Sequence, residues 1–425
     1  MPGLTAGHYF CIYHRVMKRF FLMLATVTAV LSVASCAKGY FSRFVEGVSL
    51  GEKDALGGDA PGDGQGGGSL AGLVTAGEWN DLAHWPFWSN LMLSQAGKDQ
   101  EGEAVDFSGM SDYWKFYTNN RVAVCVKDGT GAPVAGAKVA LLRGGEALWK
   151  AVTDNAGRAD LWVSLYQKED LADNAGLSLL VEGQAVAEAP VVSPWDAAAD
   201  VTVNQVVLAA QPSVTMQADI AFIVDATGSM ADEIDFLKDD LLDVLNRTTG
   251  QQGNIALRTA ALFYRDKGDT YLTRVSDFSA DAGTTVDFIK QQSANGGGDY
   301  PEAVHTALEV SLESLAWAQD ARTKLAFMLL DAPAHHDDKG VVESLQQSIR
   351  AYAEKGIRLI PVASSGVDKD TEFMLRFFAI ATGGTYVFLT NDSGVGGDHI
   401  TATVGEYQVE YLGDLLVRLI GQFTR

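Results

Sequence analysis

The C-terminal half of the chain alternates between continuous apolar runs and stretches with the spacing of amphipathic helices. The apolar runs typical of strands are Ile220–Val224, Ala256–Phe263, Leu325–Leu330, Arg358–Ala363 and Thr385–Leu389. The helical stretches are 231–246, 301–317, 341–354, 370–381 and 406–422. Buried strands that alternate with helices indicate a parallel sheet with helices on both faces. Residues 216–425 are therefore predicted to form a doubly wound α/β domain that folds by itself.

The hydrophobic pattern has a period of two over residues 119–212. The strand candidates there are 121–127, 137–142, 149–153 and 158–165. Because turns that contain glycine separate these short runs, the pattern predicts a second domain, an all-β sandwich of antiparallel strands. Cys125 alternates with valines in the first run, so it is expected to be a buried core residue rather than a nucleophile.

Two motifs in this β-rich region resemble the carboxypeptidase regulatory-like domains. They are Gly131-Ala-Pro-Val-Ala-Gly-Ala-Lys-Val139 and Thr153-Asp-Asn-Ala-Gly-Arg-Ala159. Domains of that family are usually spacers or binding modules on exported proteins, and the resemblance implies the same role here.

The N-terminus has the features of an export signal. Met17-Lys-Arg supplies a positive start, an apolar stretch follows over 20–33, and small residues precede Cys36. The sequence Val33-Ala-Ser-Cys36 resembles a bacterial lipobox. The resemblance implies a signal peptide and lipobox over 1–36, a true start at Met17, and lipid on Cys36. We therefore expect a lipoprotein of the cell envelope, at the outer membrane or facing the periplasm, and the sequence leaves its surface exposure open.

Two segments join this signal to the predicted domains. Residues 37–72 are rich in Gly and Asp, which predicts a flexible linker. Residues 73–118 form an aromatic-rich connecting segment. Its closely spaced aromatic residues are Trp79, Trp85, Phe87 and Trp88. Such density predicts packing against a neighbouring domain, although an aromatic patch for glycan or protein contact has the same composition.

Composition and charge narrow the classes of function. The 425 residues are 47% hydrophobic and 20% charged, which is typical of globular protein, and the length suits several domains. The formal net charge is −22. Nucleic acids and anionic membranes both require basic surface, so neither is an expected partner. Membrane attachment would come from the N-terminal lipid alone.

Oxygen-bearing side chains follow the first predicted strand of the α/β domain. Asp225, Thr227 and Ser229 occupy alternate positions, so all three can point at one site before the next helix begins. Hard oxygen ligands suit Mg²⁺, or else Ca²⁺ or Mn²⁺. Asp331 ends another apolar run, and ligands of such sheets bind at the carboxyl ends of the strands. The sequence therefore predicts a divalent-cation site at this edge.

These residues resemble the metal-ion-dependent adhesion site (MIDAS) of von Willebrand factor A domains. Asp225-Ala-Thr-Gly-Ser229 matches the family motif Asp-x-Ser-x-Ser, with Thr for the first Ser, and the loop 295–302 and Asp331 follow in the family's order. The resemblance implies that the three residues of the first motif ligate directly and that Asp331 ligates through water.

The second loop departs from the adhesive pattern of that family. Asp299 stands where the adhesive domains have a Thr, and by register it is the preferred ligand, directly or through water. Glu302 is an additional candidate for a ligand or for the rim of the site.

The resemblance implies protein binding rather than catalysis, either adhesion or complex assembly. The cation would bridge the domain to an acidic side chain on a protein partner. Because Asp299 neutralises part of the cation's charge, an assembly subunit with a purely structural metal is one alternative. A metal-dependent hydrolase is another, although no Ser-His-Asp or Cys-His nucleophile arrangement is evident. His335-His-Asp-Asp338 is expected to be a surface loop rather than a zinc cluster, because adjacent residues rarely converge on one metal.

Overall fold

The structure is a computed structural model that describes residues 74–94, 97–168, 175–251, 255–393 and 398–425. The predicted signal, the lipidation residue Cys36, the alternative start Met17 and the 37–72 linker lie outside these residues. Within the described ranges, no helix has the length and apolar character needed to cross a membrane.

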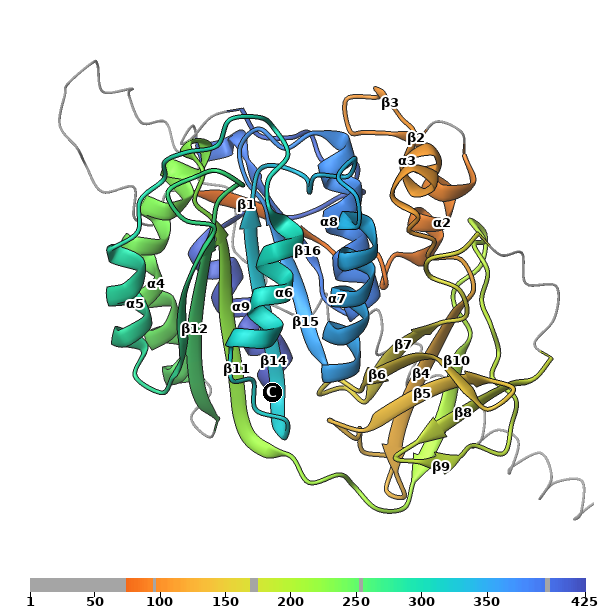
Figure 1. Ribbon diagram of the computed structural model, residues 1–425. Helices are drawn as coiled ribbons and strands as arrows, with labels where there is room; N and C mark the ends of the chain where they lie inside the picture. The colour runs from red at the N-terminus through yellow and green to blue at the C-terminus, as the bar shows by residue number, and fades with distance from the viewer. Residues whose placement is uncertain (1–73, 95–96, 169–174, 252–254, 394–397) are drawn as a thin grey trace, which may run out of the picture. The chain divides into compact units, whose positions relative to one another are not determined.

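An eight-stranded mixed sheet forms the centre of the C-terminal domain, in the order β13-β12-β11-β14-β15-β16-β1-β17 (Figure 1). Five of its strands pair in parallel: β11 (Thr215–Asp225), β12 (Ala256–Tyr264), β14 (Ala321–Leu330), β15 (Ile357–Ala363) and β16 (Tyr386–Thr390). They coincide with the five strands predicted from apolar runs. The antiparallel strands are β13 (Thr273–Ser279), β1 (Thr75–Trp79) and β17 (Glu410–Tyr411). The sequence did not predict these three, because β13 is half exposed, β17 has two residues, and β1 lacks a continuous apolar run.

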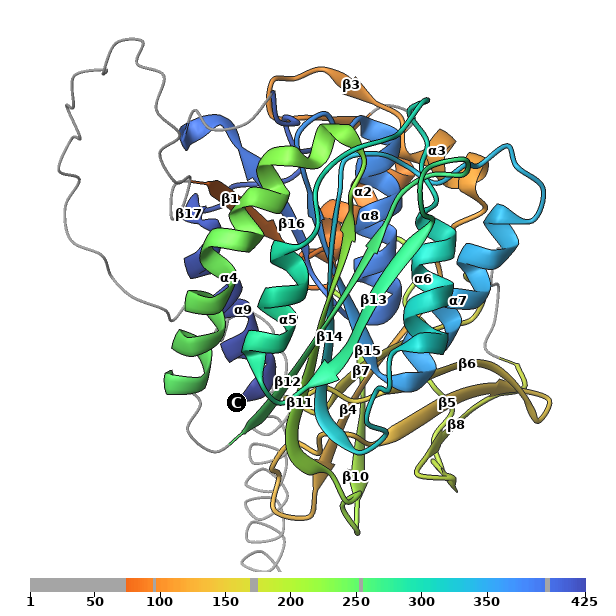
Figure 2. The ribbon, with the colours of Figure 1, turned by 60° about the vertical axis from the view of Figure 1, so that its left-hand side comes forward.

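Helices cover both faces of this sheet, as the sequence predicts. One face carries α4 (Ala231–Gln251), α5 (Ala282–Lys290) and α9 (Leu412–Thr424). The other carries α6 (Val304–Ser314), α7 (Val341–Lys355) and α8 (Lys369–Thr382). Figure 2 shows α4, α5 and α9 on one side of the strands and α6 and α7 on the other. The continuous apolar strands are thus buried from both sides, which is why they lack alternation.

The β-rich region contains two smaller sheets. The first has the order β10-β4-β7, with β4 (Arg121–Asp128), β7 (Arg158–Trp162) and β10 (Val203–Leu208). The second has the order β6-β5-β8-β9, with β5 (Lys138–Arg143), β6 (Glu146–Val152), β8 (Leu177–Val181) and β9 (Gln184–Ala185). Cys125 in β4 is 1% exposed, as expected of a core residue. The pairing of β10 with β4 is parallel, so the expectation of purely antiparallel strands is wrong for that pair.

The aromatic-rich segment 73–118 packs against the α/β domain. After β1 it forms α2 (Trp85–Leu93), β2 (Gly97–Lys98), β3 (Ala104–Val105) and α3 (Phe107–Trp114). Trp88 of α2 stacks on Phe373 of α8 with ring centroids 6.0 Å apart, and Phe116 stacks on Phe377 at 4.0 Å. The predicted packing against a neighbouring domain is confirmed for Trp88. The segment also contributes β1 to the central sheet, so it is more than a connection.

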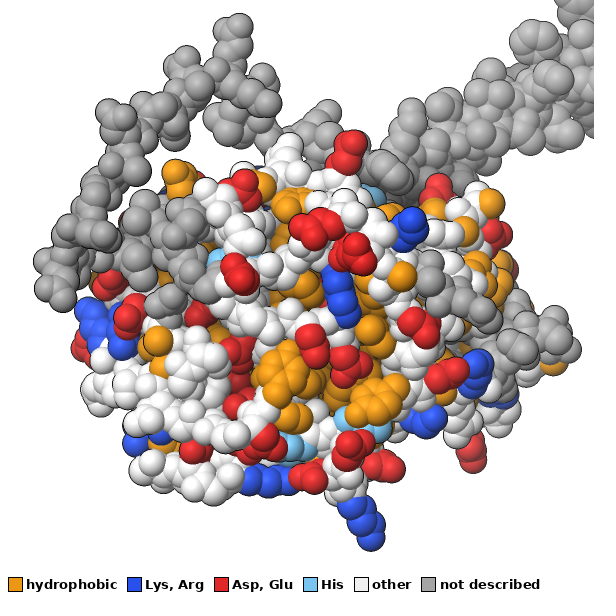
Figure 3. Space-filling model, turned by 90° about the horizontal axis from the view of Figure 1, so that it is seen from above, with side chains coloured by type: hydrophobic (Ala, Val, Ile, Leu, Met, Phe, Trp, Pro, Cys, Tyr) orange, Lys and Arg blue, Asp and Glu red, His pale blue; other side chains and the backbone are white. Residues whose placement is uncertain are grey.

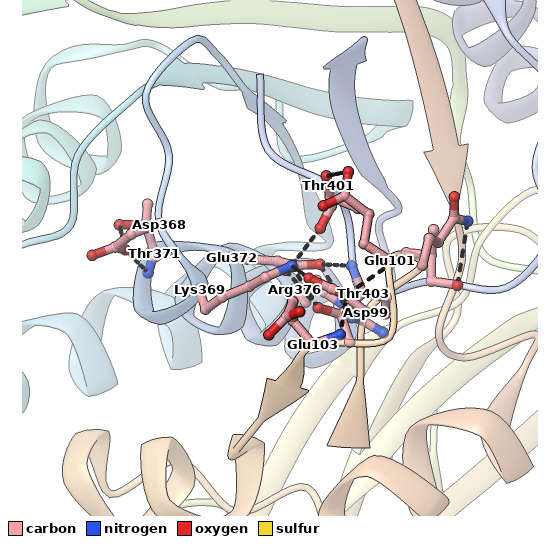
Figure 4. Close-up of polar contacts among 12 residues, drawn as sticks. Asp99, Glu101, Glu103, Asp368, Lys369, Thr371, Glu372, Arg376, Thr401 and Thr403 are labelled. Atoms are coloured by element: carbon pink, nitrogen blue, oxygen red, sulfur yellow. Dashed lines mark hydrogen bonds and ion pairs between the residues drawn. The ribbon is translucent and has the colours of Figure 1, made fainter. Parts of the chain in front are cut away.

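A buried ion-pair network ties this segment to α8. The guanidinium of Arg376 is fully buried and donates to both carboxylate oxygens of Asp81, at 2.9 and 2.6 Å. Glu372, one turn earlier, is also fully buried and accepts from the backbone N–H of Thr403 at 2.7 Å. Figure 4 shows Lys369, Glu372 and Arg376 of α8 gathered around Thr403. Since buried charges are costly unless paired, this network fixes the N-terminal segment to the domain.

Candidate metal site

Three loops meet at the carboxyl ends of the parallel strands. The first loop follows β11 and contains the short helix η1 (Gly228–Met230). The second loop bonds to it twice, through Asn295 N to Ala226 O at 3.0 Å and Gly228 N to Gly296 O at 3.2 Å. It also bonds to the third loop, through Glu302 N to Pro333 O at 2.9 Å. Backbone hydrogen bonds therefore hold the three predicted motifs together.

Asp225 is the most deeply buried acid of these loops, with no exposed surface. Its Oδ1 atom accepts from the backbone N–H and the hydroxyl of Thr227, each at 2.8 Å. Its Oδ2 atom is buried and has no hydrogen-bond partner. A buried carboxylate oxygen without a partner is costly, so this atom is suited to a cation. Because the Thr227 hydroxyl donates its hydrogen bond to Asp225, the lone pairs of its oxygen stay available to coordinate a cation.

Asp331 brings a second carboxylate to the site from the end of β14. The side chain is 5% exposed. Burial raises the pKa of Asp331, and a hydrogen bond from the Ser229 hydroxyl opposes that rise. Each predicted hydroxyl ligand thus lies against one of the predicted carboxylate ligands.

The third carboxylate is Glu302 rather than Asp299. Glu302 is 4% exposed, and its Oε2 atom is buried with no hydrogen-bond partner. Asp299 is exposed. Glu302 also pairs with the third loop through an isolated β-bridge to Ala334. The register preference for Asp299 is therefore not reflected in burial.

The charge of Asp331 affects the ionisation of Asp225, and the charges of both affect that of Glu302. Burial raises the pKa of Asp225 to about 7, with a further rise from the charge of Asp331, against the hydrogen bonds from Thr227. Burial also raises the pKa of Glu302 to about 9, and the charges of Asp225, Asp266, Asp331 and Asp269 add to the effect. Like charges that repel in this way favour a bound cation.

The donor set fits a hard divalent cation. No group of three or more His, Cys, Asp or Glu side chains in the described part of the chain is placed to hold a metal by itself. Hydroxyls would therefore have to complete the ligand set. Thr227 and Ser229 supply them, and oxygen ligands of this kind are those that Mg²⁺ and Ca²⁺ prefer. Bound metal would neutralise the carboxylates and satisfy the two orphaned oxygens.

Gly297 lets the second loop approach the first. Its φ angle is +75°, and an added Cβ would lie 3.1 Å from Glu302 Oε1 and 3.3 Å from Thr227 Cβ. We expect Gly297→Ala to cost about 1–2 kcal/mol in stability because of the left-handed backbone. It should also weaken Mg²⁺ binding by displacing Glu302. Thermal unfolding and metal calorimetry measure the two effects. Gly298→Ala is the matched control, since an added Cβ there meets nothing within 4 Å. Equal metal affinity in both variants would contradict this role.

The rim of the site contains residues that the sequence only partly indicated. Arg265 donates to the carbonyls of Ala226 at 3.0 Å and Ser293 at 2.7 Å. Asp266 lies 2.7 Å from Nε2 of His335. His336 turns away from the site, with Nε2 2.9 Å from the Tyr113 carbonyl. Since the two histidines have separate partners, they form no shared cluster.

Two buried groups near the carboxylates were not predicted. Glu233 is 5% exposed; its Oε1 accepts from the backbone N–H and hydroxyl of Ser365, and its Oε2 has no partner. The fully buried Tyr264 hydroxyl lies beside Asp225 and lowers the pKa of that carboxyl, although no hydrogen bond of ordinary geometry joins the two. Burial raises the pKa of Tyr264 strongly, and the charge of Asp225 adds to it. The signals available were a Glu four residues after Ser229 and a Tyr at the end of an apolar run.

Comparison with known proteins identifies the family of the region that carries these loops. A sequence model of the von Willebrand factor A domain matches residues 219–359. The chain contains a von Willebrand A domain. Domains of this family are in general interaction modules rather than catalysts. The matched range includes all three loops, from Asp225 to Asp331.

Curated relatives share part of this domain. A putative ariadne-like RING finger protein, R811, of Acanthamoeba polyphaga mimivirus is 30% identical over 118 residues, 28% of this chain and 11% of that protein. The alpha-protein kinase vwkA of Dictyostelium discoideum is 29% identical over 143 residues, 33% of this chain and 22% of the kinase. The matches thus span less than a quarter of either relative.

Solved structures with a similar region include BatB from Bacteroides thetaiotaomicron. It is 12% identical, with a TM-score of 0.34, over 48% of this chain and 98% of BatB. A von Willebrand factor type A protein from Catenulispora acidiphila is 15% identical, with a TM-score of 0.32, over 49% of this chain and 43% of that one.

Proposed function

We propose that this protein binds a protein partner at the cell envelope through a divalent cation held in its von Willebrand A domain. Asp225, Thr227, Ser229, Glu302 and Asp331 hold the cation, which is Mg²⁺ or a similar ion. An acidic side chain of the partner completes the coordination. The observation that carries the proposal is the buried, unpartnered Oδ2 of Asp225 beside two other buried carboxylates and two hydroxyls.

The coordination chemistry favours an exchangeable position on the cation. A metal site made partly of hydroxyls and waters leaves the ion electrophilic, so an outside carboxylate gains by joining it. The protonation state of Glu302 determines how strongly the cation attracts an outside carboxylate. If the raised pKa of Glu302 keeps it protonated, only the charges of Asp225 and Asp331 balance the cation. If Glu302 ionises, three negative charges balance the cation, and its attraction for a partner's carboxylate falls.

The number of protons released when Mg²⁺ binds shows whether Glu302 ionises in the metal-bound state. Metal displaces protons from its ligands. With a pKa of about 7 for Asp225 and about 9 for Glu302, Mg²⁺ binding at pH 7 should release about one and a half protons if both ionise. It should release about half a proton if Glu302 stays protonated. Calorimetry in buffers with different ionisation enthalpies measures the number. No release at pH 7 would contradict the placement of these carboxylates.

The same shifts set the pH dependence of stability in the metal-free protein. Both carboxyl groups have folded-state pKa values above their ordinary ones. Their contribution to stability is therefore fully present below about pH 4 and is lost as pH rises through about 7 and then 9. Bound Mg²⁺ removes this loss, so the stabilisation by Mg²⁺ should grow between pH 5 and 9.

A structural metal is the second candidate role. Its supporting observation is that three buried carboxylates lie in these loops, since their combined charge could neutralise a divalent ion completely. In that case the domain belongs to an assembly subunit, and its partner binds equally well with and without the metal.

Envelope attachment completes the proposal. Support comes from the lipobox-like Val33-Ala-Ser-Cys36, whose cysteine would carry the lipid. We expect Cys36→Ser to abolish fatty-acid labelling and to move the protein from the membrane fraction to the soluble fraction, because no other anchor is proposed. Labelling of the variant at the wild-type level would exclude the lipobox.

A capture experiment tests the function. The purified protein is incubated with envelope extract in Mg²⁺ or in chelator, and retained proteins are identified. The proposal expects a partner that is retained only in Mg²⁺ and is lost with Asp225→Asn. The control is Glu188→Gln, which removes one negative charge, as Asp225→Asn does, at an exposed position between β9 and β10. This variant should still retain the partner in Mg²⁺. A partner retained equally in chelator and by Asp225→Asn would instead indicate the structural role.

A further inference from the structure

Two exposed tyrosines and four carboxylates form a patch beside the candidate metal site. We call it the aromatic–acidic patch. Its members are Tyr113, Tyr300, Asp299, Asp337, Asp368 and Asp370. The two tyrosines are 44% and 43% exposed, respectively. Figure 3 looks down on the corresponding face and shows large hydrophobic side chains among carboxylates.

The patch adjoins two of the three metal-site loops, the second and the third. Asp299 and Tyr300 belong to the loop that ends in Glu302. Asp337 follows Asp331 in the third loop. Asp368 donates its backbone N–H to the hydroxyl of Tyr300 at 3.1 Å. A partner whose acidic side chain reaches the cation would therefore lie over this patch.

Tyr113 is held in place by His336. The two rings are stacked, with centroids 3.5 Å apart and planes at 20°. The His336 ring is anchored in turn, with Nδ1 3.0 Å from Asp337 Oδ1 and Nε2 2.9 Å from the Tyr113 carbonyl. One face of the tyrosine is thus covered, and the exposed part is fixed in orientation.

Tyr300 is anchored at the N-terminal end of α8. Besides the contact with Asp368, its hydroxyl lies 3.2 Å from the hydroxyl of Thr371 and 3.4 Å from the carbonyl of Gly366. The hydroxyl is therefore satisfied within the protein, and the exposed surface is mainly ring. Rigid aromatic rings of this kind bind partners with little loss of side-chain entropy.

Among the described residues, no lysine or arginine forms an ion pair with a carboxylate of the patch. Asp337 contacts His336 and lies close enough to Tyr113 to raise the pKa of that phenol, and Asp370 accepts from the indole N–H of Trp114 at 2.9 Å. Asp368 caps α8 by accepting from Thr371 N at 2.8 Å. Guanidinium groups lie over Tyr271, but none lies over either tyrosine of the patch in the described structure.

We infer that this patch binds an arginine or lysine side chain of the same partner that supplies the acidic ligand. A cation over a tyrosine face, with carboxylates nearby, gains both cation–π and ionic attraction. The inference rests on the proposed cation site, since that site explains why a partner lies here. The partner surface is therefore mixed: one carboxylate for the metal and at least one basic side chain for the patch.

Synthetic peptides test the inference without knowledge of the natural partner. The probes are Gly-Ser peptides that carry one Asp and one Arg at graded separations, with Arg→Gln and Asp→Asn versions of each. They are immobilised and incubated with the purified protein in Mg²⁺ or in chelator. We expect Arg to be preferred over Gln by about 5- to 30-fold in both solutions, because the patch needs no metal. Asp should be preferred over Asn only in Mg²⁺.

Two variants test whether the preference for Arg peptides arises at the patch. Tyr113→Leu and Asp337→Asn should each remove most of the preference for Arg over Gln and leave the preference for Asp over Asn in Mg²⁺ unchanged. The control Glu188→Gln should change neither of these two preferences. Absence of an Arg preference, or an Arg preference that persists in both variants, overturns the inference. Loss of the Asp preference in Mg²⁺ with the Arg preference intact would instead overturn the cation site.

Discussion

Asp225→Asn should abolish Mg²⁺ binding and stabilise the metal-free protein above pH 7. The substitution removes a ligand whose Oδ2 atom is buried with no partner. Affinity should fall by more than about 100-fold, since loss of a residue that merely orients a ligand costs about 10- to 100-fold. The same change removes a buried charge that Asp331 repels, so the metal-free variant should unfold at a higher temperature.

Added Mg²⁺ should make the wild type more stable than Asp225→Asn. At a concentration of 100 times its Kd, Mg²⁺ stabilises the wild type by about 2.7 kcal/mol and should hardly stabilise the variant. Calorimetry and thermal unfolding, each with and without Mg²⁺, measure both effects. Asp299→Asn is the matched control. Because Asp299 is exposed, this substitution should leave the affinity for Mg²⁺ unchanged. If Asp299→Asn lost metal while Asp225→Asn kept it, the ligand assignment would be wrong.

A fragment of residues 216–425 should fail to fold cooperatively, contrary to the expectation from its hydrophobic pattern. The strand β16 pairs with β1 at five positions but with β15 at only two. Without β1, therefore, β16 loses most of its hydrogen-bonded register. Arg376 would also lose Asp81 and remain buried with an incomplete set of partners, a change that costs about 3–5 kcal/mol.

Fragment 74–425 is the control for this experiment. It keeps β1 and α2 together with the aromatic contacts to α8, such as that between Trp88 and Phe373. It should show one sharp unfolding transition in denaturant, whereas 216–425 should give a broad transition or aggregate. Sharp unfolding of 216–425 with dispersed amide NMR signals would show that the N-terminal segment is dispensable for the fold.

Sequence patterns were sufficient for the parts of the fold that depend on local signals. Long apolar runs give the five parallel strands, and Asp225-Ala-Thr-Gly-Ser229 marks the loop after the first of them. The order of the three motifs correctly anticipated the von Willebrand A domain that the family comparison shows. These features lie in short stretches of sequence, where periodicity and residue type determine the structure.

Pairings between distant segments could not be predicted. Thr75 pairs with Thr390, and Val203 pairs in parallel with Ala123. Nothing in the sequence Thr75-Ala-Gly-Glu-Trp79 distinguishes β1 from a connecting loop. The burial of Glu302, whose backbone bridges to Ala334 of another loop, likewise depends on the tertiary structure. The motif register favoured Asp299 because a sequence motif contains no information about burial.

The position of the bound ion tests the central claim most directly. Crystals of the protein soaked in Mn²⁺ would show an anomalous peak at the ion. Our account predicts one such peak near Asp225 Oδ2 and Glu302 Oε2, with oxygen ligands at about 2.0–2.6 Å that include Thr227 or Ser229. A saturated crystal with no peak at these residues, or with a peak only at Asp299, would contradict it.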